Sequence, residues 1–224
     1  MSKFLPHSQL STLQCRVLEE FFARDQNFFL TGGAALAGFF LGHRQTDDLD
    51  LFTSDQTSFD QAPLVLQSVA TALGATLAVR QHAPGFRRVV LTTEQLGSVV
   101  IDFVHDRGVA AFPDKQRFGN IVVDPVAEIL INKLTAVVGR AEERDLVDLL
   151  CLANSGLSII DSVAAAQEKD GGCTPANLAW LLSEVHIPDD IQLPAQISPA
   201  QLRTFVAQLI VDLRHLALPT IAPA

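Results

Sequence analysis

The sequence predicts an α/β domain over residues 1–120, followed by a helical domain over residues 121–224. In the first part, short β-rich apolar runs alternate with segments of helical periodicity, which is typical of a sheet flanked by helices. In the second part, Asp124-Pro125, Thr174-Pro175 and Ser198-Pro199 each place a capping side chain before a proline suited to the first helical turn. A chain of 224 residues can form one large domain or two small ones.

The first domain should open with a helix over residues 11–24, because Leu13, Val17, Phe21 and Phe22 form an apolar stripe. Gly32-Gly33 should then make a tight turn between a strand and a helix. The expected strands are 28–31, 49–52, 75–80, 87–92 and 98–104, the last two forming a hairpin, and the expected helices are 34–41 and 59–73.

The second domain should contain five helices, with Gly156 and Gly171 separating some of them. The expected ranges are 125–138, 141–154, 158–169, 175–186 and 199–216. Trp180 and the many phenylalanines lie in apolar periodic segments, so they are expected in cores rather than as platforms for stacking bases.

The composition favours a soluble protein of the cytoplasm. The formal net charge of −9 argues against broad electrostatic binding to nucleic acid, although a local basic patch stays possible. No run approaches the roughly 20 apolar residues that cross a bilayer, so no membrane association is expected, and the segment Met1–Cys15 has no export-signal pattern. Three cysteines, odd in number and far apart, indicate neither a disulfide framework nor a zinc site.

The tripeptide Asp48-Leu49-Asp50 is a candidate metal site. Side chains alternate along a strand, so the two carboxylates lie on one face, about 7 Å apart along the backbone. Two like charges so close need a cation or water between them. The alternative is a solvated acidic turn, since such tripeptides are common in loops.

Asp102 interrupts the apolar strand Val99–Val104, where an uncompensated carboxylate would cost several kcal/mol. A salt bridge with Arg87 or Arg88 is one way to compensate it. A metal shared with Asp48 and Asp50 is the favoured interpretation, because carboxylates suit the hard cation Mg²⁺. Two such ions about 4 Å apart could clamp the attacking and leaving oxygens of a phosphoryl transfer.

Gly32 and Gly33 have no Cβ to obstruct the backbone, and their N–H groups open onto a helix N-terminus. A phosphate could bind there. By itself, a Gly-Gly pair between a strand and a helix indicates only a tight turn.

The segments Leu30–Leu36 and Gly42–Phe52 together resemble the polymerase-beta-type minimal nucleotidyltransferases, particularly the AbiEii/AbiGii toxin family. Fourteen residues separate Gly33 from Asp48, slightly more than the family leads us to expect, and Thr46 stands where serine is frequent. The resemblance implies a mixed sheet of polymerase-beta type, Mg²⁺ or Mn²⁺ on the three aspartates, and a nucleoside triphosphate as substrate.

A second block is similar to the lysine, arginine and Arg-Asp-x-x-Asp signature of AbiEii-like proteins: Asn132-Lys133, Arg140 and Arg144–Leu149. By that resemblance, Lys133 is a catalytic residue that meets triphosphate oxygens, and Asp145 orients Lys133 or the acceptor. The alternative is an exposed helix on which Arg144 and Asp148 form an i,i+4 pair.

Several further polar residues lie near these motifs. The resemblance implies that Gly32, Gly33, Arg44, Thr46, Lys133 and Asp145 bind the nucleotide. Arg44 could reach the triphosphate or pair with Asp47. His43 and His105 flank the acidic segments but are not expected to be ligands, since Mg²⁺ prefers oxygen.

The predicted reaction is transfer of a nucleoside monophosphate from a triphosphate to a hydroxyl or phosphate acceptor. The resemblance implies a toxin of a toxin–antitoxin or phage-defence pair, acting on RNA such as tRNA or on protein, with a cognate antitoxin as a possible partner. Two alternatives stay open: an antibiotic-modifying nucleotidyltransferase with a small-molecule acceptor, and a catalytically silent module that binds a partner.

Overall fold

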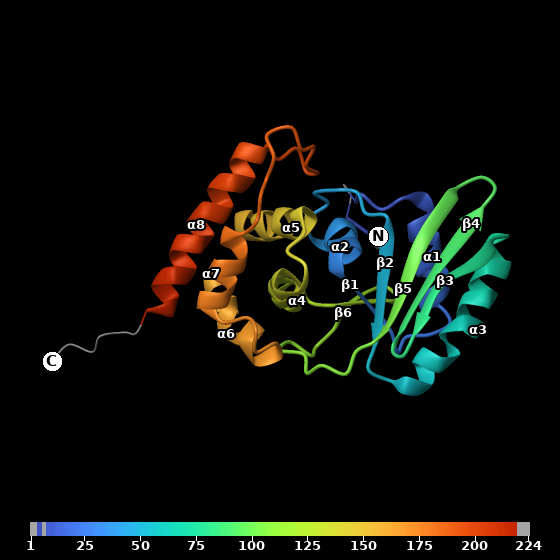
Figure 1. Cartoon of the computed structure of the whole chain (residues 1–224). Helices are drawn as coiled ribbons and strands as arrows, with labels where there is room; N and C mark the ends of the chain where they lie inside the picture. The colour runs from blue at the N-terminus through green and yellow to red at the C-terminus, as the bar shows by residue number, and fades with distance from the viewer. Residues whose placement is uncertain (1–3, 6–7, 219–224) are drawn as a thin grey trace. The chain divides into compact units, whose positions relative to one another are not determined.

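The structure is a computed structural model that describes residues 4–5 and 8–218. It forms two compact units, one of residues 1–108 and 112–126 and the other of residues 109–111 and 127–224. The first unit contains the sheet and the second is helical (Figure 1).

Within the described residues, the first unit has one sheet of seven strands in the order β3-β4-β5-β2-β1-β7-β6. β2 is parallel to β5 and β1 is parallel to β7, whereas the other neighbours are antiparallel. The strands are β1 (Phe29–Thr31), β2 (Asp48–Thr53), β3 (Thr76–Ala83), β4 (Phe86–Thr93), β5 (Gly97–His105), β6 (Gln116–Phe118) and β7 (Ile121–Val123).

One face of this sheet is covered by α1 (Thr12–Phe22) and α3 (Gln56–Leu73), which pack on each other and on β5. Phe21 of α1 lies 5.6 Å from Phe103 of β5 between ring centroids, and Leu49 and Leu51 of β2 are fully buried. Since strand side chains alternate, Asp48, Asp50 and Asp102 belong to the opposite face. The buried aromatic core therefore determines which face presents the acidic residues.

The junction between β1 and the next helix is abrupt. α2 (Gly32–Ala35) starts directly after Thr31 and continues as the π-helix η1 (Leu36–Phe40), so Gly32-Gly33 lies within the helix rather than in a separate turn. Gly32 has φ +65°, a left-handed conformation that glycine adopts without a steric penalty. This residue makes the change from strand to helix.

The helical unit is built from α4 (Val126–Gly139), α5 (Glu143–Asn154), α6 (Ile159–Lys169), α7 (Pro175–Ser183) and α8 (Pro199–Ala217). The hydroxyls of Ser158, Thr174 and Ser198 cap α6, α7 and α8, and each accepts a bond from the backbone N–H three residues later. α8 packs against α5, α6 and α7. The cap-and-proline pattern thus starts α7 and α8 as predicted.

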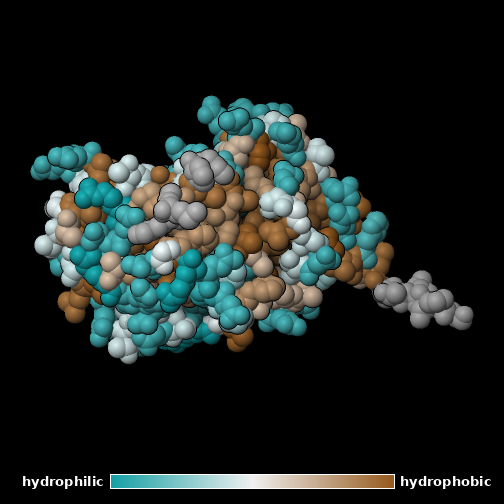
Figure 2. Space-filling model, turned by 180° about the vertical axis from the view of Figure 1, so that it is seen from behind, coloured by the Kyte–Doolittle hydropathy of each residue, from teal (hydrophilic) through white to brown (hydrophobic). Residues whose placement is uncertain are grey.

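The surface of the helical unit includes hydrophobic residues (Figure 2), and exposed ones are Trp180, Val211 and Leu216. Trp180 was expected in a core, and that expectation is wrong, because its side chain lies on an outward face of α7. No helix among the described residues is both long and apolar enough to cross a bilayer.

The predicted mixed α/β class is confirmed. The pattern did not predict the short hairpin of β6 and β7, and it extended α7 three residues too far. Asp124, which precedes α4, accepts a bond from Lys115 at 2.5 Å and so ties the end of β7 to the segment before β6.

Candidate active site

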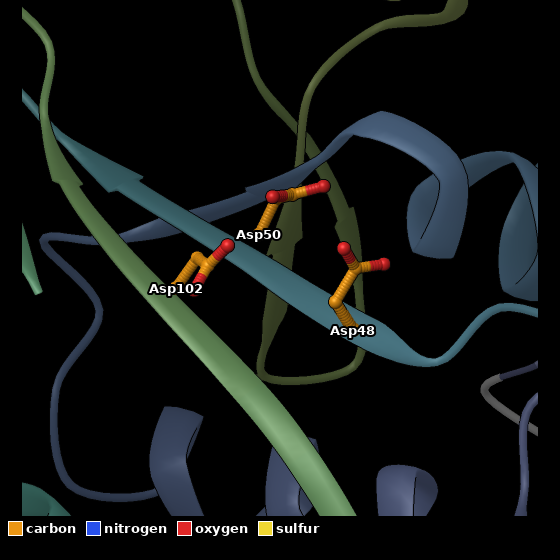
Figure 3. Close-up of side chains that lie close together, drawn as sticks. All are labelled: Asp48, Asp50 and Asp102. Atoms are coloured by element: carbon orange, nitrogen blue, oxygen red, sulfur yellow. The ribbon is translucent and has the colours of Figure 1, made fainter. Parts of the chain in front are cut away.

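Three carboxylates converge on the face of the sheet opposite α1 and α3 (Figure 3). Asp50 of β2 pairs in register with Asp102 of the parallel strand β5, and Asp48 stands two residues before Asp50 on the same face. Each residue offers one oxygen, and the three oxygens lie within 4.8 Å of one another. The trio Asp48, Asp50 and Asp102 is thus arranged so that one cation could contact all three.

Asp102 is only 4% exposed, and its carboxylate is bound by Arg88 of β4, its neighbour in register. Arg88 donates from Nε to Oδ1 at 2.8 Å and from Nη2 to Oδ2 at 2.6 Å. The hydrogen bonds to Asp102, together with the attraction of Asp102, Asp48 and Asp50, raise the pKa of Arg88 above its ordinary value. The salt bridge considered as an alternative to a metal is therefore present, in the same place as the acidic trio.

Asp48 is oriented from the preceding loop. Thr46, which is buried, donates from Oγ1 to Asp48 Oδ1 at 3.0 Å. The backbone carbonyl of Thr46 in turn accepts a bond of 2.8 Å from Gln14 Nε2 of α1. The loop that presents the first aspartate is thereby fixed to the helix that covers the other face.

The two glycines are in close contact with this loop and with the trio. A Cβ at Gly32 would lie 2.3 Å from Asp50 Oδ2, and a Cβ at Gly33 would lie 2.6 Å from Arg44 Nη2. Arg44 is buried and donates to the backbone carbonyl of Gln45 at 3.0 Å, so it braces the loop around Gly33. A side chain at Gly32 or Gly33 would therefore have to displace Asp50 or Arg44 from its present position.

Thr31 adds a hydroxyl to the row of Asp50, Asp102 and Arg88. It pairs in register with Asp50 and therefore lies on the same face. Its side chain is 3% exposed, and its Oγ1 has no hydrogen-bond partner within the described part of the chain. A buried hydroxyl without a partner is uncommon and indicates a group that a bound ligand or water can satisfy.

Lys133 and Asp145 lie in the helical unit, on α4 and α5. Lys133 is 6% exposed, and its Nζ lies 2.8 Å from Asp145 Oδ1 and 2.6 Å from Asp148 Oδ2. Burial by itself lowers the pKa of Lys133, but the attraction of Asp148 and Asp145 outweighs it and raises the pKa above its ordinary value. Asp145 also accepts from Arg140 Nε at 2.9 Å.

Asp148 was not predicted as a site residue, and the alternative interpretation placed it on an exposed helix. The structure buries it beside Lys133, so this side of α5 is not exposed. Its spacing of three residues from Asp145 puts both carboxylates on one side of α5, which is the signal in the sequence that could have identified it.

The two histidines are not part of the acidic trio within the residues that the structure describes. His105 stacks on Phe59, with ring centroids 5.8 Å apart.

We predict that Gly32→Ala lowers turnover about 100-fold, because the added methyl group displaces Asp50 and strains the backbone. Gly74→Ala is the matched control: Gly74 has φ +61°, and nothing lies within 4 Å of a Cβ there. Steady-state rates and thermal melting of both variants check this. Equal turnover losses in the two variants would mean that backbone strain alone is responsible.

Two solved structures have a similar fold. JHP933 from Helicobacter pylori gives a TM-score of 0.54 at 15% sequence identity and covers 91% of each chain. MenT4, a nucleotidyltransferase toxin from Mycobacterium tuberculosis H37Rv, gives 0.51 at 16% identity and covers 93% of this chain and 83% of its own. The chain therefore has the fold of a nucleotidyltransferase.

Residues 16–218 match the family described as nucleotidyl transferase AbiEii toxin, type IV TA system. The match spans most of the chain, so the chain belongs to the AbiEii family and is a nucleotidyltransferase toxin. No curated protein matches the sequence.

Proposed function

We propose that this enzyme transfers a nucleoside monophosphate from a nucleoside triphosphate to a hydroxyl or phosphate acceptor on RNA, such as tRNA, or on protein. The observation that carries this proposal is the acidic trio, whose oxygens lie within 4.8 Å of one another beside Gly32. Its cognate antitoxin is the expected partner, and the cytoplasm is the expected compartment.

The residues present fit Mg²⁺ or Mn²⁺. The trio offers only carboxylate oxygens, which are the ligands that hard divalent cations prefer. Asp48 and Asp50 would bridge two ions, and Asp102 would hold the ion nearer the acceptor. When bound, these ions would neutralise phosphate charge and lower the pKa of the acceptor hydroxyl.

In the proposed reaction, an acceptor oxygen attacks the α-phosphorus and forms a new P–O bond. The bond from the α-phosphorus to the bridging oxygen breaks, pyrophosphate leaves, and the acceptor proton passes to solvent. Gly32 and Gly33 leave the backbone open to a phosphate, and the Thr31 hydroxyl is available as a donor. Thr46 keeps Asp48 oriented, and Arg44 supports the loop.

For Lys133 and Asp145 we keep the roles that the family pattern implies, a phosphate contact and its orienting partner. The ion pairs of Lys133 with Asp145 and Asp148 support an orienting role for the carboxylates. For Lys133 to contact a phosphate as well, its ammonium must replace part of its pairing with Asp145 and Asp148 by that contact.

The direct test is to incubate the protein with Mg²⁺, with total RNA or cell protein as acceptor, and with one nucleoside triphosphate at a time. Each triphosphate is labelled at either the α- or the γ-phosphorus. Nucleotidyl transfer predicts that the α-label joins a macromolecule and that the γ-label leaves with pyrophosphate. Transfer of the γ-label would contradict the proposal, because it indicates a kinase. Labelling only of small hydroxylated compounds would favour the antibiotic-modifying alternative.

We predict that Asp102→Asn lowers turnover about 100-fold while triphosphate affinity changes by less than about tenfold. The reason is that Asp102 is assigned to the acceptor side of the trio. Single-turnover rates and calorimetric affinities check this division of labour. An equal loss of both quantities would contradict it.

A further inference from the structure

Arg88 stands at the end of the row Thr31, Asp50, Asp102 and Arg88, which crosses four neighbouring strands in register. The proposed function assigns a role to the trio of carboxylates but none to this arginine. A role for Arg88 at that site rests on the proposed function.

The contact between Arg88 and Asp102 fixes both the position and the plane of the Asp102 carboxylate. Both oxygens of Asp102 accept from one guanidinium, at 2.8 and 2.6 Å, so the plane of the carboxylate follows the plane of the guanidinium. A carboxylate has about four lone-pair positions, and this fork uses two of them. The remaining positions stay available, and one oxygen of Asp102 lies within 4.8 Å of the oxygens of Asp48 and Asp50.

Arg88 also supplies the positive charge that this face of the sheet needs. Without a cation, three carboxylates this close repel one another, and Asp102 is buried. The side chain of Arg88 is 44% exposed, so its charge is partly screened by water but still acts on all three aspartates. It offsets about one of the three negative charges.

The neighbouring arginine shows that this placement is specific. Arg87 points to the other face of β4, where its guanidinium lies 4.5 Å from the ring centroid of Phe59 and donates to the Phe59 carbonyl at 2.7 Å. It pairs weakly with Asp60 at 3.6 Å. Two adjacent arginines on one strand thus serve opposite faces, and Arg88 alone of the two contacts the trio.

We propose that Arg88 is a positioning residue of the metal site: it holds Asp102 in the orientation that faces Asp48 and Asp50, and its charge weakens metal binding until a triphosphate arrives. The first role requires the fork of the guanidinium. The second requires only its positive charge, because a triphosphate brings its own negative charge to the ions.

The two roles are separated by Arg88→Lys and Arg88→Gln in the full-length protein. Lysine keeps the charge and loses the fork, whereas glutamine loses both. We expect both variants to lose kcat about 10- to 100-fold, with the triphosphate KM changed far less, because Asp102 is misplaced. Because both variants misplace Asp102, the effect of charge lies in the difference between them. We expect Arg88→Gln to bind Mn²⁺ alone about tenfold more tightly than Arg88→Lys does, because only glutamine removes the positive charge near the trio.

Mn²⁺ titrations followed by electron paramagnetic resonance at pH 8, together with steady-state label transfer, measure both quantities. Arg87→Lys is the matched control and should change neither the Mn²⁺ affinity nor kcat of the folded protein. Slower turnover in both variants, together with tighter Mn²⁺ binding by Arg88→Gln than by Arg88→Lys, supports the proposal, because an arginine that only stabilises the fold would not separate the two variants in this way.

Unchanged kcat in both Arg88 variants would overturn the positioning role, and Mn²⁺ binding by Arg88→Gln that is no tighter than binding by Arg88→Lys would overturn the charge role. If Arg88→Gln does not fold, Arg88→Lys still tests the positioning through kcat. If the wild-type protein transfers label and both Arg88 variants have the same kcat and Mn²⁺ affinity as wild type, this inference alone is overturned. A folded wild-type protein that binds neither Mn²⁺ nor a triphosphate would overturn the proposed function and this inference together.

Discussion

Asp48→Asn and Asp50→Asn should each reduce turnover by about 1,000-fold or more. Each change removes one negative charge from a trio whose oxygens lie within 4.8 Å of one another. Metal ions contribute several kcal/mol to the stabilisation of charge in a phosphoryl transition state, and each 1.36 kcal/mol is tenfold in rate. Transfer of α-label from the triphosphate measures the effect directly.

Asp47→Asn is the control for these two variants. It makes the same chemical change one residue before Asp48, at an exposed side chain outside the trio. Its turnover should stay within about threefold of wild type, because a surface charge acts weakly across water. A similar loss in all three variants would show that net charge, rather than ligand position, controls the rate.

Lys133→Met should destabilise the protein by about 3–5 kcal/mol and lower Tm by roughly 10 °C. The substitution leaves Asp145 and Asp148 buried on the same side of α5 without the ammonium that lies within 2.8 Å of both. Arg140 still pairs with Asp145, but Asp148 loses its ion pair with Lys133 of α4. Thermal and urea unfolding measure the loss.

The triple variant Lys133→Met, Asp145→Asn, Asp148→Asn separates stability from chemistry. Removing the two carboxylates should restore a large part of the lost stability, because no uncompensated charge remains. If Lys133 also contacts phosphate, the restored protein stays inactive. Recovery of turnover in the triple variant would rule out the catalytic role of Lys133, and a Tm unchanged by Lys133→Met would contradict the structural role.

The acidic trio could be anticipated from the sequence because each member breaks a local rule. Asp48 and Asp50 alternate with leucines on a short strand, and Asp102 interrupts a run that is otherwise apolar. The charges of carboxylates on two such strands can be compensated together if the strands are neighbours. Parallel pairing of β2 with β5 brings the carboxylates into one row. Here the pattern contained enough information to predict the convergence.

Other features depend on tertiary context that the pattern does not contain. The sequence does not distinguish Arg87 from Arg88. Only the pairing register of β4 with β5 decides which of them contacts Asp102. The strands β6 and β7 have three residues each, too few for alternation to be visible. Asp148 has helical spacing that suits a surface ion pair as well as a buried one, so its burial follows from the packing of α4 on α5.

The most direct test of the central claim, that Asp48, Asp50 and Asp102 hold divalent ions against a nucleoside triphosphate, is isothermal titration calorimetry. Folded wild-type protein is titrated with each of the four ribonucleoside triphosphates, with Mg²⁺ and with excess EDTA, beside the double variant Asp48→Asn, Asp50→Asn. We expect at least one triphosphate to bind only when Mg²⁺ is present, and the double variant to lose that binding. Absence of Mg²⁺-dependent binding for all four triphosphates, or equal binding by the double variant, would contradict the claim.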